Sequence, residues 1–86
     1  MKFNSKLTIN NFVNTTTMNR YPVKSNNIVF IGYDEVDQLL EIQFKLNVIH
    51  QYLEVPLSKF VALMKAQSID DFYFKFIQNK YHYNMF

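Results

Sequence analysis

The hydrophobic pattern of the sequence changes its period at Pro56. Before this proline, residues 39–44 alternate, with Leu40, Ile42 and Phe44 on one side and polar residues between them. A period of two is typical of a half-buried β-strand. After Pro56, apolar residues recur at helical spacing, and the proline itself suits the first turn of a helix. The sequence therefore predicts an α+β fold in which the strands come first and the helices follow.

The strands are expected to form a small antiparallel meander of three or four members, with both helices packed on one face. Residues 28–33 are apolar and rich in β-forming side chains, and an acidic turn follows them. Residues 39–44 and 48–55 complete the meander, because a turn at Leu46 and Asn47 separates them. Asparagine tolerates the left-handed backbone conformation that such a turn needs.

The chain of 86 residues is expected to form one domain, because two independent cores would each fall below the usual minimum size. Residues 23–86 form the domain proper. Residues 1–22 are rich in Asn and Thr, lack a helical period, and form either an N-terminal extension or an extra edge strand. Phe3, Leu7 and Ile9 sit at odd positions there, which suits a short edge strand.

Two amphipathic helices are predicted after the strands. Ser68 caps the N-terminus of the second helix, with Asp71 three residues further on, and this helix ends near Asn79. Large apolar residues form one stripe along each helix, at spacings of three and four. They are Leu57, Phe60, Val61 and Met64 in the first helix and Ile69, Phe72, Tyr73, Phe76 and Ile77 in the second, with Phe60, Met64, Phe72 and Phe76 expected to be buried against the sheet.

The composition excludes several classes of protein. The chain has no cysteine, so a disulfide framework and a thiolate metal site are both ruled out. Residues 1–11 lack the apolar core of a signal peptide, and no apolar run approaches membrane-spanning length. We therefore expect a cytoplasmic protein that does not enter a membrane. The net charge of +2 is too small to argue for nucleic-acid binding by itself.

No catalytic centre, metal site or cofactor site can be recognised. The two histidines are His50, on a predicted strand, and His82, among the C-terminal residues. No histidine pair at metal-ligand spacing, nucleophile motif or glycine-rich phosphate loop accompanies them. The sequence therefore predicts a non-enzymatic protein without a cofactor.

A set of short motifs occurs in order between residues 23 and 83. It consists of Ser25, Ile28, Ile31-Gly32-Tyr33-Asp34, Leu40-x-Ile42-x-Phe44, Val55-Pro56, Phe60, Leu63, Ala66-x-Ser68, Ile77, Tyr81 and Tyr83. In these residues the chain resembles the KTSC domain, a small domain found at the C-terminus of some lysyl-tRNA synthetases and as short stand-alone proteins. The resemblance implies a role in RNA binding.

The sequence departs from the pattern of that family at positions where function would be expected. The family's central Tyr-x-Tyr is His50-Gln51-Tyr52 here, and its turn glycine is Asn47. In the second helix, the positions that are usually Gly, Asn and Arg are Asp70, Phe74 and Gln78. Because the helix loses a polar, partly basic face, any phosphate contact implied by the resemblance is weakened.

The orientation of His50 and Tyr52 depends on the length of the turn before them. A two-residue turn directs both side chains away from the apolar face of the neighbouring strand. There they would offer a platform on which RNA bases could stack. A three-residue loop reverses the two faces and buries both side chains against Leu40 and Ile42.

The first functional hypothesis is a module that binds single-stranded RNA. His50 and Tyr52 would stack on bases, and Lys24 and Arg20 would supply cations from the basic N-terminal third of the chain.

The second hypothesis is a protein-interaction module, such as an inhibitor, an immunity factor or a self-associating domain. By helical period, Phe74 sits opposite the apolar stripe of its helix. A large aromatic side chain on a polar face suggests contact with residues 1–22, with the C-terminal tail or with another chain, and the last of these would make it an interface residue. Met85 and Phe86 are further candidates for this interface, since they form an apolar end after the second helix.

Overall fold

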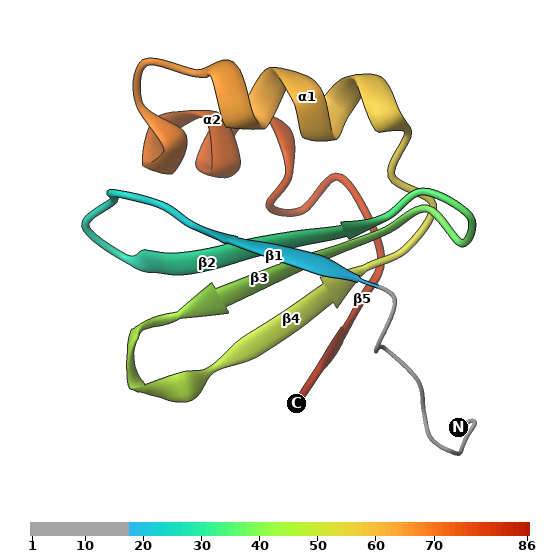
Figure 1. Cartoon of the computed structure of the whole chain (residues 1–86), viewed down its shortest axis with the longest axis horizontal. Helices are drawn as coiled ribbons and strands as arrows, with labels where there is room; N and C mark the ends of the chain where they lie inside the picture. Colours follow the sequence, from blue (N-terminus) through green and yellow to red (C-terminus); the bar gives the residue numbers. More distant parts are fainter. Residues whose placement is uncertain (1–17) are drawn as a thin grey trace.

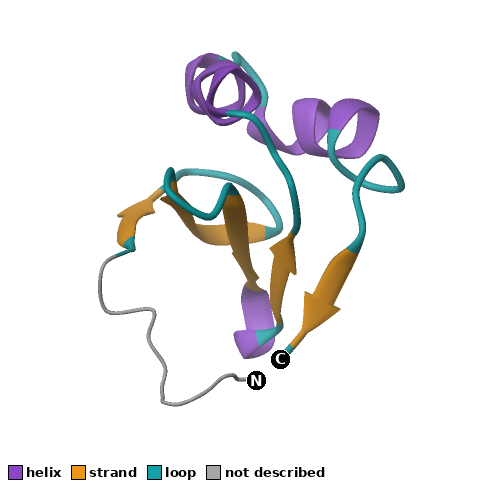
Figure 2. Ribbon diagram, turned by 90° about the vertical axis from the view of Figure 1, so that its right-hand side faces the viewer, coloured by secondary structure: helices purple, strands orange, loops and turns teal. Residues whose placement is uncertain are grey.

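The computed structural model describes residues 18–86 and places two helices over one face of a five-stranded sheet (Figure 1). The elements, in chain order, are β1 (Asn19–Pro22), β2 (Ile28–Asp34), β3 (Leu39–Phe44), the 3-10 turn η2 (Lys45–Asn47), β4 (Ile49–Tyr52), α1 (Leu57–Lys65), α2 (Ile69–Phe76) and β5 (Tyr83–Met85). Figure 2 shows both helices on the same side of the sheet. The predicted α+β class is confirmed, whereas the candidate strand around Leu7 lies outside the described residues.

The strands lie in the order β1-β2-β3-β4-β5, and every neighbouring pair is antiparallel. The meander of β2, β3 and β4 agrees with the expectation from the sequence. β1 adds an edge strand before it. β5 was not expected: the chain returns after both helices and pairs with β4. The described sheet therefore has one strand more than the upper end of the expectation.

The core lies between the helices and the helix-facing side of the sheet. Alternate residues of the central strands point toward it, and Ile31, Leu40 and Ile42 are fully buried. Leu63 from α1 and Ile77 after α2 belong to the same cluster and are also fully buried. Removing this apolar surface from water is the main force that holds the two layers together.

Tyr33 links the sheet to the start of α1. Its hydroxyl donates a hydrogen bond to the Val55 carbonyl, with 2.5 Å between the oxygens. Its ring stacks on Phe60, with 4.8 Å between centroids and 7° between planes. Burial, together with the charges of Glu35 and Asp34, raises the pKa of Tyr33, so the hydroxyl stays protonated and able to donate. Phe60 therefore packs against the core as predicted.

The helices begin as predicted, but the buried face of α2 is narrower than its apolar stripe. The Ser68 hydroxyl accepts a hydrogen bond from the Asp71 backbone N–H at 3.1 Å, which confirms the expected cap. The expected burial of Phe76 is wrong, because its side chain is 45% exposed. It lies beside α1, where the Lys59 ammonium is 5.4 Å from the ring centroid, and Tyr73 is buried instead. Neither described helix is long and apolar enough to cross a membrane.

The loop between β3 and β4 has three residues, which is the longer of the two turns that the sequence left open. The Phe44 N–H donates to the Val48 carbonyl at 2.7 Å, which closes the loop around Lys45–Asn47. Asn47 has the expected left-handed backbone (φ 62°), and Leu46 adopts it as well (φ 67°). The left-handed conformation of Leu46 could not be expected from the sequence, because residues with a bulky side chain rarely adopt it.

Asp70 ties the loop between β1 and β2 to the first turn of α2. Its carboxylate accepts hydrogen bonds from the Ser25 hydroxyl at 2.6 Å and from the Asn26 backbone N–H at 2.9 Å. Partial burial acts to raise the pKa of Asp70, but these bonds and those from Asn27 outweigh it and lower the pKa. The acid at this family position therefore holds the fold together locally.

Candidate functional site: an aromatic cluster and the groove beside it

The three-residue loop sets which way the side chains of β4 point. It pairs Ile42 with His50 and Leu40 with Tyr52, so both β4 side chains lie on the helix-facing side of the sheet. Tyr52 is only 1% exposed, and His50 is partly buried. Of the two orientations that the sequence left open, the structure has the buried one, and Tyr52 offers no surface on which a base could stack.

Three polar side chains form a hydrogen-bonded chain inside this cluster. The Tyr52 hydroxyl bonds to the Tyr73 hydroxyl at 2.5 Å and to His50 Nδ1 at 3.1 Å. Burial raises the pKa of Tyr52, with a further contribution from the bond to Tyr73, and burial also raises the pKa of Tyr73. Burial lowers the pKa of His50. All three groups are therefore neutral near pH 7, and each phenol keeps its proton.

This chain of hydrogen bonds satisfies the polar atoms of three side chains in the cluster. A tyrosine nucleophile or base needs a lowered pKa, whereas the pKa values of Tyr52 and Tyr73 are raised. Burial is the cause of the His50 shift, with no charged partner contributing from the described residues. Within residues 18–86, no group of three or more acids and histidines could hold a metal ion.

Tyr83 completes the aromatic cluster from β5, a strand that the sequence-based reasoning missed. It pairs with Tyr52 in the sheet, and its ring stacks on His50 with 4.5 Å between centroids. The signal was the alternation of Tyr81, Tyr83 and Met85 with polar residues, which has the period of a strand. A three-residue strand is short for such a pattern to be recognised.

An open groove of about 490 Å³ lies beside the cluster, between α2 and the start of β4. We call it the α2–β4 groove. Phe44, Leu46, Val48, His50, Tyr73 and Phe74 form most of its lining, with the polar residues Asn27, Lys45 and Gln78. The rings of Phe44 and Phe74 meet Tyr73 edge-on, at 5.4 Å and 5.3 Å between centroids, and form an aromatic wall.

The groove brings exposed apolar side chains together. Leu46 is 94% exposed, Phe74 is 50% exposed and Val48 is 37% exposed. Phe74, which helical period placed opposite the apolar stripe of α2, is therefore half-exposed. Met85 and Phe86 are also exposed, at 65% and 68%, but they belong to the β5 end of the sheet and do not line the groove.

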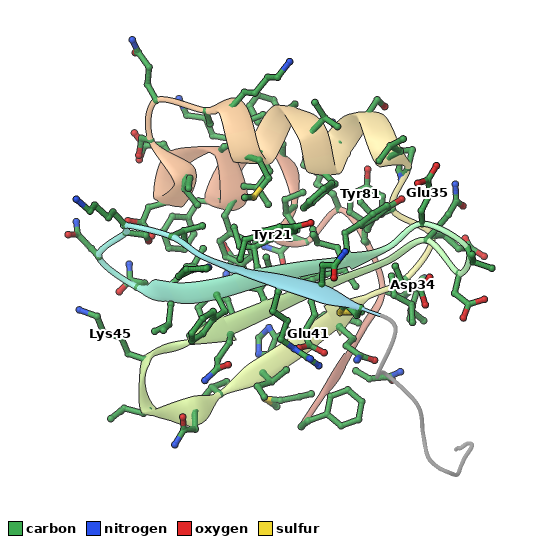
Figure 3. The ribbon with its side chains drawn as sticks, in the orientation of Figure 1. Tyr21, Asp34, Glu35, Glu41, Lys45 and Tyr81 are labelled. Atoms are coloured by element: carbon green, nitrogen blue, oxygen red, sulfur yellow. The ribbon has the colours of Figure 1, made fainter. Side chains whose placement is uncertain are left out.

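The expected cations lie elsewhere. Arg20 lies on the side of the sheet without helices, where its Nε is 2.5 Å from Oε2 of Glu41. Figure 3 shows Glu41 on that side. Glu41 is only 3% exposed and also accepts a bond from Gln51 at 2.8 Å. Lys24 is exposed in the loop that faces the start of α2. The structure therefore does not gather Arg20 and Lys24 with the His50–Tyr52 pair.

Gly32 explains how Arg20 reaches Glu41. In the ladder, Gly32 lies between these two residues, opposite Arg20 on one side and Glu41 on the other. A Cβ at Gly32 would be 2.8 Å from Met18 Sδ and 3.1 Å from Arg20 Cγ. The glycine leaves room for the arginine side chain to cross β2, so this ion pair is part of the sheet and Arg20 is not a free cation.

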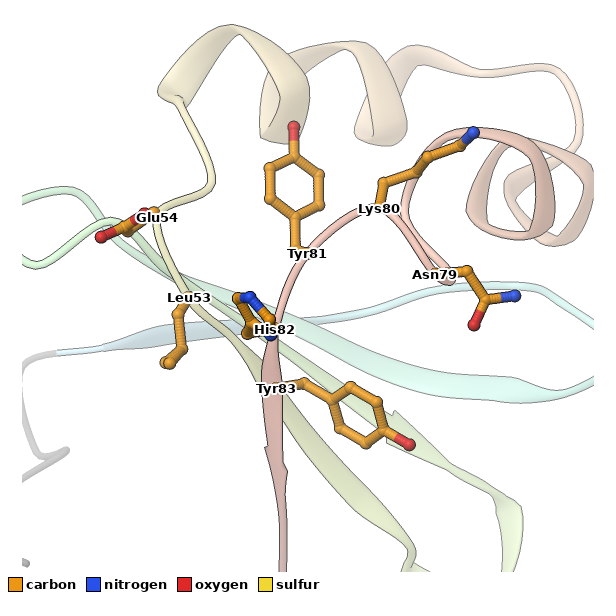
Figure 4. A pocket seen from close by; sticks show the side chains of 7 residues that line it. All are labelled: Leu53, Glu54, Asn79, Lys80, Tyr81, His82 and Tyr83. Atoms are coloured by element: carbon orange, nitrogen blue, oxygen red, sulfur yellow. The ribbon is translucent and has the colours of Figure 1, made fainter.

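A second hollow lies between the chain after β4 and the chain before β5 (Figure 4). Its lining residues are Leu53, Glu54, Asn79, Lys80, Tyr81, His82 and Tyr83. Figure 4 shows the side chains of Glu54 and Lys80 pointing in different directions, with the ring of Tyr81 between them. The two charged side chains therefore do not face each other across this hollow.

The fold and the cluster define a small α+β domain with two hydrogen-bonded tyrosines buried beneath its helices. A sequence profile of the KTSC domain matches residues 24–81, and the chain belongs to the KTSC domain family. A KTSC domain protein from Yersinia pestis, known from its crystal structure, has a TM-score of 0.78 at 38% identity, over 80% of this chain and 97% of that chain. An uncharacterised protein of Stutzerimonas stutzeri (strain A1501) is 33% identical over 52 residues, 60% of this chain and 73% of its own length.

Proposed function

We propose that this KTSC domain is a protein-binding module whose α2–β4 groove receives an apolar side chain of a partner protein. The observation that carries the proposal is Leu46, which is 94% exposed and has a left-handed backbone with φ 67°. A side chain in this conformation costs about 1–2 kcal/mol relative to ordinary backbone. Strained residues of this kind are concentrated at functional sites.

The strain at Leu46 is not offset by burial among the described residues. A glycine or asparagine would adopt the same backbone at lower cost. The leucine instead adds apolar surface at the mouth of a groove that Phe74 and Val48 also leave exposed. Contiguous exposed apolar surface with an aromatic wall is typical of protein-binding sites.

The charges around the groove also favour a protein partner over RNA. Lys45 is the one charged residue in the lining, so a phosphate backbone would find little to neutralise there. Arg20 is paired with Glu41, and Tyr52 is buried. Two of the four residues on which the RNA-binding hypothesis was based, Arg20 and Tyr52, are therefore not available to contact RNA.

The test is capture of binding partners from the native host by the immobilised 86-residue protein, after nuclease treatment. Two variants, Leu46→Asn and Phe74→Ser, remove apolar surface on opposite sides of the groove. The matched control is Val36→Ser, because Val36 is 91% exposed on the turn between β2 and β3, at the other end of β3. A protein retained by the parent and the control and lost from both groove variants supports the proposal.

The captured protein is then purified and titrated against each variant by calorimetry. We expect Leu46→Asn and Phe74→Ser each to weaken binding about tenfold or more, as apolar residues central to an interface do. Unchanged affinity in both groove variants would overturn the proposal. Binding of labelled single-stranded RNA that both variants weaken would instead assign the groove to nucleic acid.

A further inference from the structure

The described sheet has two edges, and they differ in how they resist pairing with another chain. β1 carries Pro22, which lacks a backbone N–H, and the charged residue Arg20. Prolines and charges are the usual devices by which edge strands avoid association. β5 has the sequence Tyr83-Asn84-Met85, without a charge or a proline. Of the two edges, only that of β5 is unprotected.

The hydrogen bonds to β4 show which backbone groups of β5 point outward. The Leu53 N–H donates to the His82 carbonyl and the Phe86 N–H donates to the Ile49 carbonyl, both at 2.8 Å. Asn84, paired with Gln51, lies between these two bonds in the ladder. In an antiparallel pair, alternate residues of a strand direct their N–H and C=O groups to the same neighbour. The N–H and C=O groups of Tyr83 and Met85 therefore point away from β4.

We propose that β5 pairs antiparallel with β5 of a second copy of this chain, about a twofold axis at Asn84. In this register Tyr83 of each copy lies opposite Met85 of the other. Each such pair exchanges two backbone hydrogen bonds, so the four outward groups of each strand all find partners. The two five-stranded sheets become one continuous sheet.

The side chains of β5 are complementary to themselves in this register. Tyr83 and Met85 lie on the helix-facing side, because they pair with Tyr52 and His50 across the ladder. They are 47% and 65% exposed, so each has surface left to bury. A tyrosine ring opposite a methionine is a favourable sulfur–aromatic contact. On the other side, the two Asn84 amides face each other and can exchange hydrogen bonds.

Charge does not oppose this association, but the small contact limits its strength. β5 itself is uncharged, and each copy has a net charge of only +2. Three residues per copy bury much less surface than a standard stable interface. The dimer is therefore weak, and its population rises with protein concentration. No residue of β5 lines the α2–β4 groove, so this inference does not depend on the proposed function.

Analytical ultracentrifugation of the 86-residue protein over about a hundredfold concentration range tests the inference. The parent is expected to shift from one copy toward two as concentration rises. Met85→Pro should remain monomeric, because it removes an outward N–H and leaves the bonds between β4 and β5 in place. Met85→Lys, which adds an edge charge, should also remain monomeric. Phe74→Ser is the control and should dimerise like the parent.

Amide hydrogen exchange, measured by NMR on the parent, gives a readout without mutation. The amides of Tyr83 and Met85 should gain protection as concentration rises, whereas the Asn84 amide, which bonds to β4, should be unchanged. A parent that stays monomeric at the highest concentration would overturn the inference. So would a dimer that persists in both Met85 variants and is lost in Phe74→Ser, since that result places the contact at the groove.

Discussion

The core beneath the helices and the loop that precedes β4 are neighbours, but they differ in side-chain burial and in backbone conformation. Leu63, Ile77 and Tyr52 are each at most 1% exposed, and the buried Tyr52 hydroxyl has hydrogen-bond partners. In the loop, Leu46 is 94% exposed and its backbone is left-handed. Side chains in the core stabilise the fold, whereas the backbone conformation of Leu46 in the loop destabilises it. Substitutions in the two regions should therefore change folding stability in opposite directions.

The largest effect is expected in the core. Leu63→Ala should lower the free energy of unfolding by about 2–5 kcal/mol, because it removes a fully buried side chain and leaves a cavity. Urea denaturation followed by circular dichroism measures this change. Leu57→Ala, at a position on the same helix that is 41% exposed, is the control and should change stability by about 0.5 kcal/mol or less. Equal losses in both variants would show that α1 is rotated from its observed position.

The next effect concerns the hydrogen-bonded chain of the core. Tyr52→Phe should cost about 1–3 kcal/mol of folding stability, because the Tyr73 hydroxyl and His50 Nδ1 both lose a partner. The half-exposed Tyr83 provides the comparison, since Tyr83→Phe keeps that chain intact. The two melting temperatures check the expectation. If Tyr52→Phe is as stable as the parent, the short bond between the phenols contributes nothing to the fold.

Lowering the pH should reduce the folding stability of the core, because His50 is partly buried there. Burial lowers the pKa of His50 below its ordinary value of 6.5, so the unfolded chain binds the proton more tightly than the folded one. This cost is absent well above pH 6.5 and grows as the pH falls below it, by no more than about 1.4 kcal/mol per pH unit. Denaturation curves between about pH 7 and pH 5 should show the decline. His50→Gln should flatten the curve, and an unchanged decline in that variant would place its cause at another group.

The smallest change is expected in the loop and has the opposite sign. Leu46→Asn should raise the free energy of unfolding by about 0.5–1 kcal/mol, because asparagine adopts positive φ more readily and no buried surface is lost. Val36→Asn, on the other exposed turn, serves as the reference and should have little effect. Thermal denaturation of both variants measures the difference. A destabilised Leu46→Asn would mean that the leucine packs within the domain, and the functional argument built on its exposure would fail.

Much of the fold could be predicted, because its elements have local signals. The alternation before Pro56, the cap at Ser68 and the stripe through Tyr73 each specify an element from neighbouring residues alone. β5 could not be predicted in this way, since its partner β4 is distant in sequence. The predicted burial of Phe76 was wrong for a related reason. Helical period shows which side chains share one face of a helix, but not how much of that face a neighbouring element covers.

The candidate site was less predictable than the fold, because one residue in the loop between β3 and β4 determines which face of the sheet carries His50 and Tyr52. Adding Lys45 to the turn shifts the pairing of β3 and β4 by one residue, which moves His50 and Tyr52 to the other face of the sheet. The sequence offers no strong signal for this loop, since Leu46 is unsuited to its own backbone conformation. The exposure of Phe74 was predictable, because it follows from helical period alone.

The pairing of β5 with β4 has a consequence for the order in which the protein folds. β1 to β4 are joined by short loops, whereas residues 53–82, including both helices, separate β4 from β5. Closing so long a segment costs more chain entropy than closing a hairpin, and long-range pairings form late. We therefore expect β5 to be the last strand to join and the first to fray. While it is detached, the rings of His50 and Tyr52 lose their Tyr83 neighbour, so the aromatic cluster opens from its β5 side before the rest of the domain unfolds.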